Sequence, residues 1–570
     1  MTLASGCGSP VPTQFADVLD TNYVPSKEEF DEIHAILHAP EEEIRRIDEE
    51  MSRLQTRRDI LQQFVSRHRN LVSPFRRLPG ELWAEIFTHC LPDDYLPVRS
   101  TAEAPLALTA ICRSWREVVL NTPRLWTSLH LYLPNPSRSS PSDDFVSLLN
   151  LMKEGYELWL KRSGSLPLYL SLAAEPGYDY SDFTEIMAKY SRRWKSIRLS
   201  HLPASALAPF DALSKEDLPL LEDFEEDAIM EREARLNPNQ YPPAFMHAVG
   251  ASPSLRRLHI TAPAESTPLS LPIHWATLRL LELRLPFSVT PGIESIPFMH
   301  LLVESCPLLS ECILTIQNNM IIPTHSNGPV QSKHWNQLRR LNLELTGWCS
   351  EDFESSVNRI FESLTTPALT HLSFTLTVLY PLGTDDNIER LYPTDKDLPF
   401  RNFIARSQCI LESLKLTMPL GDGFYGTLDN LTSLTTLSLS SPTWNEQLYP
   451  RDPSFLSHLG AVIQTLMPSE ESIRYPNVER LAFRPCTPRH ALALVDLIES
   501  RARVARLKCF AADFGIVLPR NARILESALE LVKSKDLGIK IDWRFYVASE
   551  GMHHYNNPHR LGVVNESGIF

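Results

Sequence analysis

The sequence contains one glycine-rich stretch whose spacing could support cofactor chemistry. Gly421, Gly423 and Gly426 fit the G-x-G-x-x-G pattern, in which a tight turn of backbone cradles the pyrophosphate of a dinucleotide. That chemistry needs a helix that opens directly after the glycines and an acidic residue about 20 residues further on. Here the following segment is a short link to another strand-like stretch. We therefore expect a surface turn at these glycines and no bound nucleotide.

Thiols and imidazoles are the other candidates for chemistry. Cys306 and Cys312 lie six residues apart, but a metal site needs further ligands at short spacing, so we expect two buried thiols. His553, His554 and His559 could bind a metal adventitiously, but a solvated tail is the stronger interpretation. No G-x-S-x-G, H-E-x-x-H or G-x-x-x-x-G-K motif occurs. We expect no catalytic residue, no metal site and no cofactor, and hence no enzyme.

Charge and composition narrow the class of protein. The 570 residues carry a formal net charge of −14, which argues against nucleic-acid binding because phosphate contacts need clustered cations. No run of about 18 apolar residues occurs, and no basic start precedes an apolar block, so we expect neither a membrane span nor a signal peptide. The nine scattered Cys favour reduced thiols, and therefore the cytoplasm or the nucleus.

A repeated pattern runs through the larger, Leu-rich part of the chain. Its template is apolar-x-x-apolar-x-apolar, and helix-like segments fill the gaps between the copies. The last two apolar positions alternate as in a strand, and one strand cannot bury that face alone, so neighbouring copies must stack. The copies begin at Trp194, Leu255, Leu278, Leu309, Leu338, Leu369, Leu411, Leu434, Val478 and Val504.

This pattern resembles a leucine-rich repeat, in which parallel strands line one face and helices cover the other. It departs from the consensus because the usual Asn or Cys is replaced, for example by Pro263 and Pro419, and because the spacing is uneven. We therefore expect an irregular leucine-rich-repeat-like solenoid over residues 145–545. The residue between the last two apolar positions should point to the open face, where target binding and plain solvent exposure are the alternatives: His259, Glu282, Asn342, Ser373, Lys415 and Ser438.

An acidic stretch interrupts the repeats. Residues 216–233 contain nine acidic residues and a single basic one, Arg232. We expect a solvated insertion between repeats here. The alternative is a surface that steers a basic target.

The N-terminal region predicts a flexible tail over residues 1–27 and a helix over residues 28–73. Arg58 interrupts a heptad pattern of apolar residues in this helix. Two interpretations remain: a coiled coil that self-associates through residues 41–65, or a single amphipathic helix that packs on its own chain. The apolar heptad positions are Ile44, Ile47, Met51, Leu54, Leu61 and Val65.

Residues 74–126 contain the most specific motif. Leu-Pro-Gly-Glu-Leu at 78–82 and Ile-Phe at 86–87 precede Cys-Arg-Ser-Trp-Arg at 112–116. Pro79 suits the start of a helix, where its missing N–H costs nothing. The apolar residues that follow fall on one helical face. A unit of about 45 residues is marginally stable alone, so a partner's helices can complete it.

These motifs resemble an F-box of the fungal, mushroom-type kind, and the flanking residues 74–77 and 122–126 match that kind as well. The resemblance implies a three-helix unit that binds the Skp-type adaptor, and through it the cullin, of an SCF-type ubiquitin ligase. A longer connection between Cys90 and Ala104 departs from the family. The alternative is that the same apolar residues form only the hydrophobic core of this three-helix unit. The family's adaptor contacts fall on Leu78, Pro79, Leu82, Ile86, Phe87 and Trp115.

Together these features predict an α/β chain: an N-terminal helix and a small three-helix F-box, followed by an irregular solenoid with parallel strands and a tail over residues 546–570. The expected function is that of a substrate-recognition subunit, whose F-box binds the adaptor and whose solenoid holds an unidentified target protein. The alternative is an interaction scaffold of the same architecture without a link to ubiquitin transfer. We expect no nucleic-acid and no membrane partner.

Overall fold

The computed structural model divides the chain into two compact units, Met1–Glu85 and Ile86–Phe570. The glycines at 421–426, the three histidines after residue 550 and the last 23 residues, 548–570, lie outside the described residues. The structure describes residues 13–72, 74–135, 143–174, 178–227, 244–261, 271–285, 293–317, 321–322, 330–348, 351–379, 399–418, 431–440, 453–468, 475–484, 486–504, 506–517, 519–535 and 537–547.

The first unit is dominated by one long helix, α1 (Lys27–Leu71), which matches the predicted helical segment. It begins with a capping box: the Glu29 N–H donates to Ser26 Oγ, and the Ser26 N–H donates to a Glu29 carboxylate oxygen at 2.7 Å. The apolar heptad side chains are exposed, for example Ile44 by 58% and Leu54 by 54%. Two short 3₁₀ helices flank α1, η1 (Ala16–Val18) and η2 (Pro74–Arg77).

Three short helices follow: α2 (Gly80–Thr88), which crosses the boundary of the units, α3 (Leu106–Ile111) and α4 (Arg113–Leu120). The 3₁₀ helix η3 (Pro123–Trp126) closes this region. In the second unit the rings of Phe87 and Trp115 pack with their centroids 4.9 Å apart. The Cys112 side chain caps α4 by accepting the Trp115 N–H at 3.5 Å. Trp126 is fully buried and donates its indole N–H to the Val119 carbonyl at 2.9 Å.

The main element of the second unit is a 14-stranded sheet whose strand order follows the chain and whose neighbours all pair in parallel. The predicted α/β class with parallel strands is therefore confirmed. The strands are β1 (Ser128–Leu133), β2 (Leu168–Ala174), β3 (Trp194–Ser200), β4 (Asp223–Asp227), β5 (Arg257–Thr261), β6 (Leu280–Leu285), β8 (Glu311–Gln317), β11 (Arg340–Trp348), β13 (His371–Leu379), β14 (Ser413–Thr417), β15 (Thr436–Ser440), β16 (Arg480–Arg484), β17 (Cys509–Val517) and β18 (Lys540–Val547).

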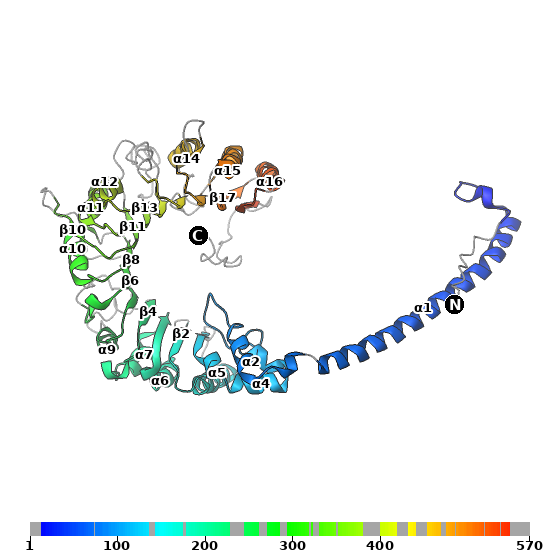
Figure 1. Cartoon of the computed structure of the whole chain (residues 1–570), viewed down its shortest axis with the longest axis horizontal. Helices are drawn as coiled ribbons and strands as arrows, with labels where there is room; N and C mark the ends of the chain where they lie inside the picture. Colours follow the sequence, from blue (N-terminus) through cyan, green and yellow to red (C-terminus); the bar gives the residue numbers. More distant parts are fainter. Residues whose placement is uncertain are drawn as a thin grey trace. The chain divides into compact units, whose positions relative to one another are not determined.

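Helices fill the connections and lie along one side of the strands (Figure 1). Two small pairs, β7 (Ile293–Glu294) with β9 (Ile321–Ile322) and β10 (Lys333–His334) with β12 (Leu364–Thr365), lie within these connections. None of the described helices is long and apolar enough to cross a membrane. The helices are α5 (Asp143–Arg162), α6 (Ser181–Ala188), α7 (Ala204–Leu207), α9 (Phe245–Gly250), α10 (Ser295–Ser305), α11 (Glu351–Glu362), α12 (Pro399–Ser407), α14 (Pro453–Leu466), α15 (Ala491–Val504) and α16 (Pro519–Lys533), with 3₁₀ turns η4 (Ser191–Arg193), η5 (Ala208–Phe210), η6 (Lys215–Asp217), η9 (Trp275–Thr277) and η11 (Pro488–His490).

The apolar pairs of the repeat template form the core beneath the helices. Leu281 and Leu283 of β6, for example, are fully buried, and their counterparts lie beside them on the neighbouring strands. The last predicted copy is wrong in its register by three residues. The template that begins at Val504 sets Leu507 and Cys509 against the buried Leu481 and Phe483, but the structure pairs these two residues with Phe510 and Ala512.

The acidic stretch is not wholly a solvated insertion, which corrects the prediction. Residues 223–227 form β4, which lies between β3 and β5 in the sheet, and the rest of the stretch beyond 227 lies outside the described residues. Phe224 explains the pairing, because it fills the core between Ile197 and Leu258. Strand alternation then places Glu226 in the core as well, opposite Leu199. Burial, reinforced by the nearby charge of Asp227, raises the pKa of Glu226 to about 8.

Candidate functional site

The six residues predicted for the open face share one row of the sheet. His259 pairs with Glu282 in register, and the row continues through Ile313 of β8 to Asn342. Asn342 then pairs with Ser373, Ser373 with Lys415, and Lys415 with Ser438. Strands of a sheet lie about 4.8 Å apart, so the row is a continuous line of side chains. The structure extends it at the N-terminal side through His130, Ser171, Arg198 and Glu225.

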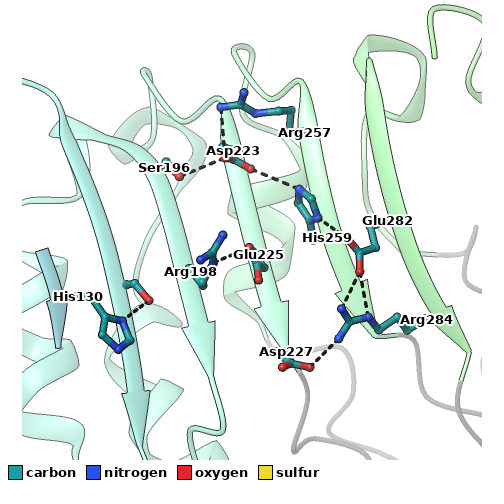
Figure 2. A network of polar contacts seen from close by, with 11 residues as sticks. His130, Ser196, Arg198, Asp223, Glu225, Asp227, Arg257, His259, Glu282 and Arg284 are labelled. Carbon is teal, nitrogen blue, oxygen red and sulfur yellow. Dashed lines mark hydrogen bonds and ion pairs between the residues drawn. The ribbon is translucent and has the colours of Figure 1, made fainter. Parts of the chain in front are cut away.

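His259 of β5 is the centre of a polar network that spans β4 to β6 (Figure 2). Its Nδ1 donates to Glu282 Oε2 at 2.9 Å, and its Nε2 lies 3.8 Å from Asp223 Oδ1. Arg284 binds the other oxygen of Glu282 at 2.7 Å and also reaches Asp227 at 3.2 Å. The imidazole and the guanidinium therefore hold the Glu282 carboxylate from two sides.

Each carboxylate that β4 points to this face is paired with a cation from another strand of the sheet: β3, β5 or β6. Arg198 Nε donates to Glu225 Oε2 at 2.5 Å, from β3. Arg257 of β5 lies 3.2 Å from Asp223, which also accepts the Ser196 hydroxyl at 3.2 Å. Figure 2 shows these contacts side by side on adjacent strands. The acidic residues of β4 are thus neutralised in place, which makes them poor candidates for steering a basic target.

The pKa values in this region follow from the same contacts. The hydrogen bond from His259, and then the charge of Arg284, hold the pKa of Glu282 below its usual range. Partial burial, together with the charge of Arg198, lowers the pKa of His130, whose Nδ1 is hydrogen-bonded to Ser171 Oγ at 2.9 Å. An ionised glutamate held by two partners suits polar recognition. It is not a proton donor near neutral pH.

A small pocket borders the carboxyl ends of these strands. Glu226, Thr261 and Arg284 are among the residues that line it. Among the described residues, no group of three or more His, Cys, Asp and Glu side chains is arranged to hold a metal ion. Sequence reasoning missed the β4 residues of this region because it treated the acidic stretch as an insertion. Phe224, an aromatic residue two places before Glu226, was the available signal for a strand.

The residues expected to contact an adaptor have different environments. In the first unit, Leu78 is half-buried, Pro79 is exposed and Leu82 is 51% exposed. In the second unit, Ile86 is 42% exposed and Phe87 is fully buried, while Trp115 is half-buried against Phe87. Phe87 therefore contributes to the core, and its side chain is not accessible to a partner.

The thiols that the sequence placed inside the protein are buried. Cys306 and Cys312 are both fully covered. Burial raises the pKa of Cys306 to about 12, and that of Cys312 lies well above its usual value. Both thiols are thus protonated at neutral pH, and neither is a nucleophile.

Neither the models of known protein families nor the curated proteins match this chain. Two surfaces of the described residues are candidates for binding a partner: the polar open face of the sheet, and the exposed apolar side chains of α2. Leu82 and Ile86 lie one helical turn apart on α2.

Proposed function

We propose that this chain is the substrate-recognition subunit of an SCF-type cullin-RING ubiquitin ligase. In this proposal residues 74–126 are an F-box that binds a Skp-type adaptor. The sheet with its helices is an irregular leucine-rich-repeat-like solenoid, and its open face holds a target protein. The cysteines of the described residues are free thiols, three of them buried and two exposed, which fits a chain that works in the cytoplasm or the nucleus.

The observation that carries the proposal is the exposure of Leu82 and Ile86 on α2. Each leaves about half of its side chain in water, although the adjacent Phe87 is fully buried. A nine-residue helix that buries one apolar side and exposes another is typical of a helix that packs on its own core and also docks a partner. These exposed residues coincide with the motif positions that resemble an F-box.

The proposed mechanism is proximity. A receptor that binds the adaptor and the target at once raises the effective concentration of the target's lysines near the charged conjugating enzyme. No residue of this chain has to form or break a covalent bond in such a mechanism. The mutually different polar residues along the open face suit the recognition of one protein surface.

A scaffold without a link to ubiquitin transfer is the second candidate function, and α1 is the observation that favours it. This 45-residue helix exposes apolar side chains at successive heptad positions, including Ile47 by 51% and Met51 by 52%. A second copy of the helix could cover them in a coiled coil. Such a dimer would present two open faces and needs no adaptor.

Co-expression with a Skp-type adaptor, followed by size-exclusion chromatography, tests the first candidate. We expect a one-to-one complex that Leu82→Asp and Ile86→Asp each abolish, because a carboxylate cannot be desolvated against an apolar partner. Leu492→Asp is the matched control, since Leu492 on α15 is also exposed, by 63%, and lies outside the motif. A folded chain that never binds the adaptor would refute the receptor and favour the scaffold.

A further inference from the structure

The pairing between β4 and β5 ends before the two strands do. Residues 223–225 of β4 pair with residues 257–259 of β5, and the register stops there. The last two residues of β4 continue to pair with β3, whereas the last two residues of β5 continue to pair with β6. The carboxyl ends of β4 and β5 are therefore not paired with each other, and the small pocket lies at these ends.

Glu226 brings a carboxyl group without a partner to this pocket. Its side chain lines the pocket, and the residue is only 8% exposed. The three open-face carboxylates of β4 are each paired with a cation. Within the part of the chain that the structure describes, the Glu226 side chain forms neither a hydrogen bond nor an ion pair. Burying a carboxyl group in this way is unfavourable, so its capacity to bind a partner is unused.

The charges around Glu226 favour a cation as that partner. The other titratable side chains that line the pocket come from three strands: Glu225 and Asp227 of β4, His259 of β5, and Glu282 and Arg284 of β6. With Glu226, the lining contains four carboxyl groups and one guanidinium. That guanidinium is already bound to Asp227 and Glu282 (Figure 2). His259 likewise donates to Glu282, and Arg198 of β3 donates to Glu225.

The size of the pocket selects among cations. It has room for a group about as large as a water molecule. An ammonium group is that compact and has three donors, whereas a guanidinium is a wider planar fork. The side chains of Asp227 and Arg284 at the rim are exposed by 40% and 50%, so a side chain can enter from solvent. Among the described residues, no cluster of side chains suits a metal ion here.

We propose that this pocket binds the ammonium group of a lysine from a partner protein, with the Glu226 carboxylate as its acceptor. The inference deepens the proposed function and rests on it, because the partner would be the target that the open face holds. In the free protein burial raises the pKa of Glu226 to about 8, so the carboxyl group keeps its proton at neutral pH. The bound ammonium group would take the place of that proton and form a charge-assisted hydrogen bond.

Fluorescence anisotropy on the full chain tests this inference without the adaptor. The probe is a short labelled peptide of alternating Lys and Ser, and matched peptides carry acetyl-lysine or Arg in place of Lys. We expect the Lys peptide to bind most tightly, and Glu226→Gln to weaken its binding by at least about tenfold. Glu216→Gln is the matched control, because it changes an exposed glutamate of the same acidic stretch and should alter the affinity by less than about twofold.

The pH dependence of binding is a second readout. A proton competes with the ammonium group for Glu226, so the Lys peptide should bind up to about tenfold more tightly at pH 8.5 than at pH 7. Glu226→Gln should lose this dependence, and Glu216→Gln should keep it. Circular dichroism checks that both variants are folded.

Equal affinity of the Lys and acetyl-lysine peptides, or an unchanged affinity in Glu226→Gln, would overturn the inference. Tighter binding of the Arg peptide would contradict the ammonium assignment. Spermidine that binds as tightly as the peptide would make the ligand a free polyamine and would contradict a partner protein. If the adaptor complex forms but the Lys peptide does not bind, this inference fails and the receptor stands. If the peptide binds and no adaptor complex forms, the receptor fails and the pocket belongs to a scaffold.

Discussion

Glu226 of β4 lies directly opposite Leu199 of β3, so a carboxyl group occupies a row of the core that is otherwise built from apolar side chains. Burial raises its pKa from the ordinary 4.5 to about 8, and the neighbouring Asp227 adds to the shift. The folded protein therefore keeps a proton on Glu226 at pH values at which the unfolded chain has released it.

The first prediction concerns this proton. Because the folded state binds more protons between pH 4.5 and about 8, the contribution of Glu226 to the free energy of unfolding should be most favourable below pH 4.5. This contribution should fall as the pH rises to about 8. Glu226→Gln should remove the dependence and stabilise the protein at pH 8.5 by on the order of a few kcal/mol. Urea unfolding at pH 5.5 and pH 8.5 measures both effects. Glu216→Gln, at an exposed position, is the control, and equal pH dependence in both variants would contradict the prediction.

The second prediction concerns the pair His259 and Glu282. Their hydrogen bond of 2.9 Å joins neighbouring strands on the half-buried face, so His259→Ala and Glu282→Ala should each destabilise the fold. Because both variants remove the same interaction, the double variant should lose less stability than the sum of the two single losses, by about 0.5–1.5 kcal/mol. The matched control pairs His259→Ala with Ser438→Ala, several strands away, whose effects should add. Additive effects of the first pair would show that the hydrogen bond contributes nothing.

The third prediction separates the core of the helical region from its surface. Phe87→Ala should destabilise this region by about 3–5 kcal/mol, because the ring is fully buried against Trp115. Leu82→Ala should change stability by less than about 0.5 kcal/mol, because half of that side chain is already in water. Urea unfolding of each variant, followed by circular dichroism, measures both changes. A large loss of stability in Leu82→Ala would show that Leu82 belongs to the hydrophobic core of the helical region.

The fourth prediction concerns α1. We expect the full chain to self-associate with increasing concentration in sedimentation velocity, and Ile47→Asp/Leu54→Asp to keep it monomeric, since both residues lie on the heptad seam. Ile60→Asp is the control, because Ile60 is 63% exposed but lies off that seam. Monomers at all concentrations, or an equal effect of the control, would rule out a coiled coil through residues 41–65.

Local patterns in the sequence determined most of the secondary structure. The alternation of Leu281 with Leu283, repeated in copy after copy, predicted the strands of the parallel sheet, because an apolar face of period two must be buried against its neighbours. The capping pair Ser26 and Glu29 similarly marks the start of α1, because both partners lie within one turn of the chain. The sequence also placed six polar residues at equivalent positions of their repeats.

Only the tertiary structure decided what those elements place together. The register of the sheet joined the six residues into one row with His130 and Glu225, which no local pattern relates. It also placed an acidic segment, β4, inside the sheet, because the burial of Phe224 outweighs the polarity of its neighbours. Packing likewise buried Phe87 and left Ile86 exposed, although the two residues are neighbours on α2. These relationships depend on contacts between distant segments, and the energy of such contacts is absent from any short stretch of sequence.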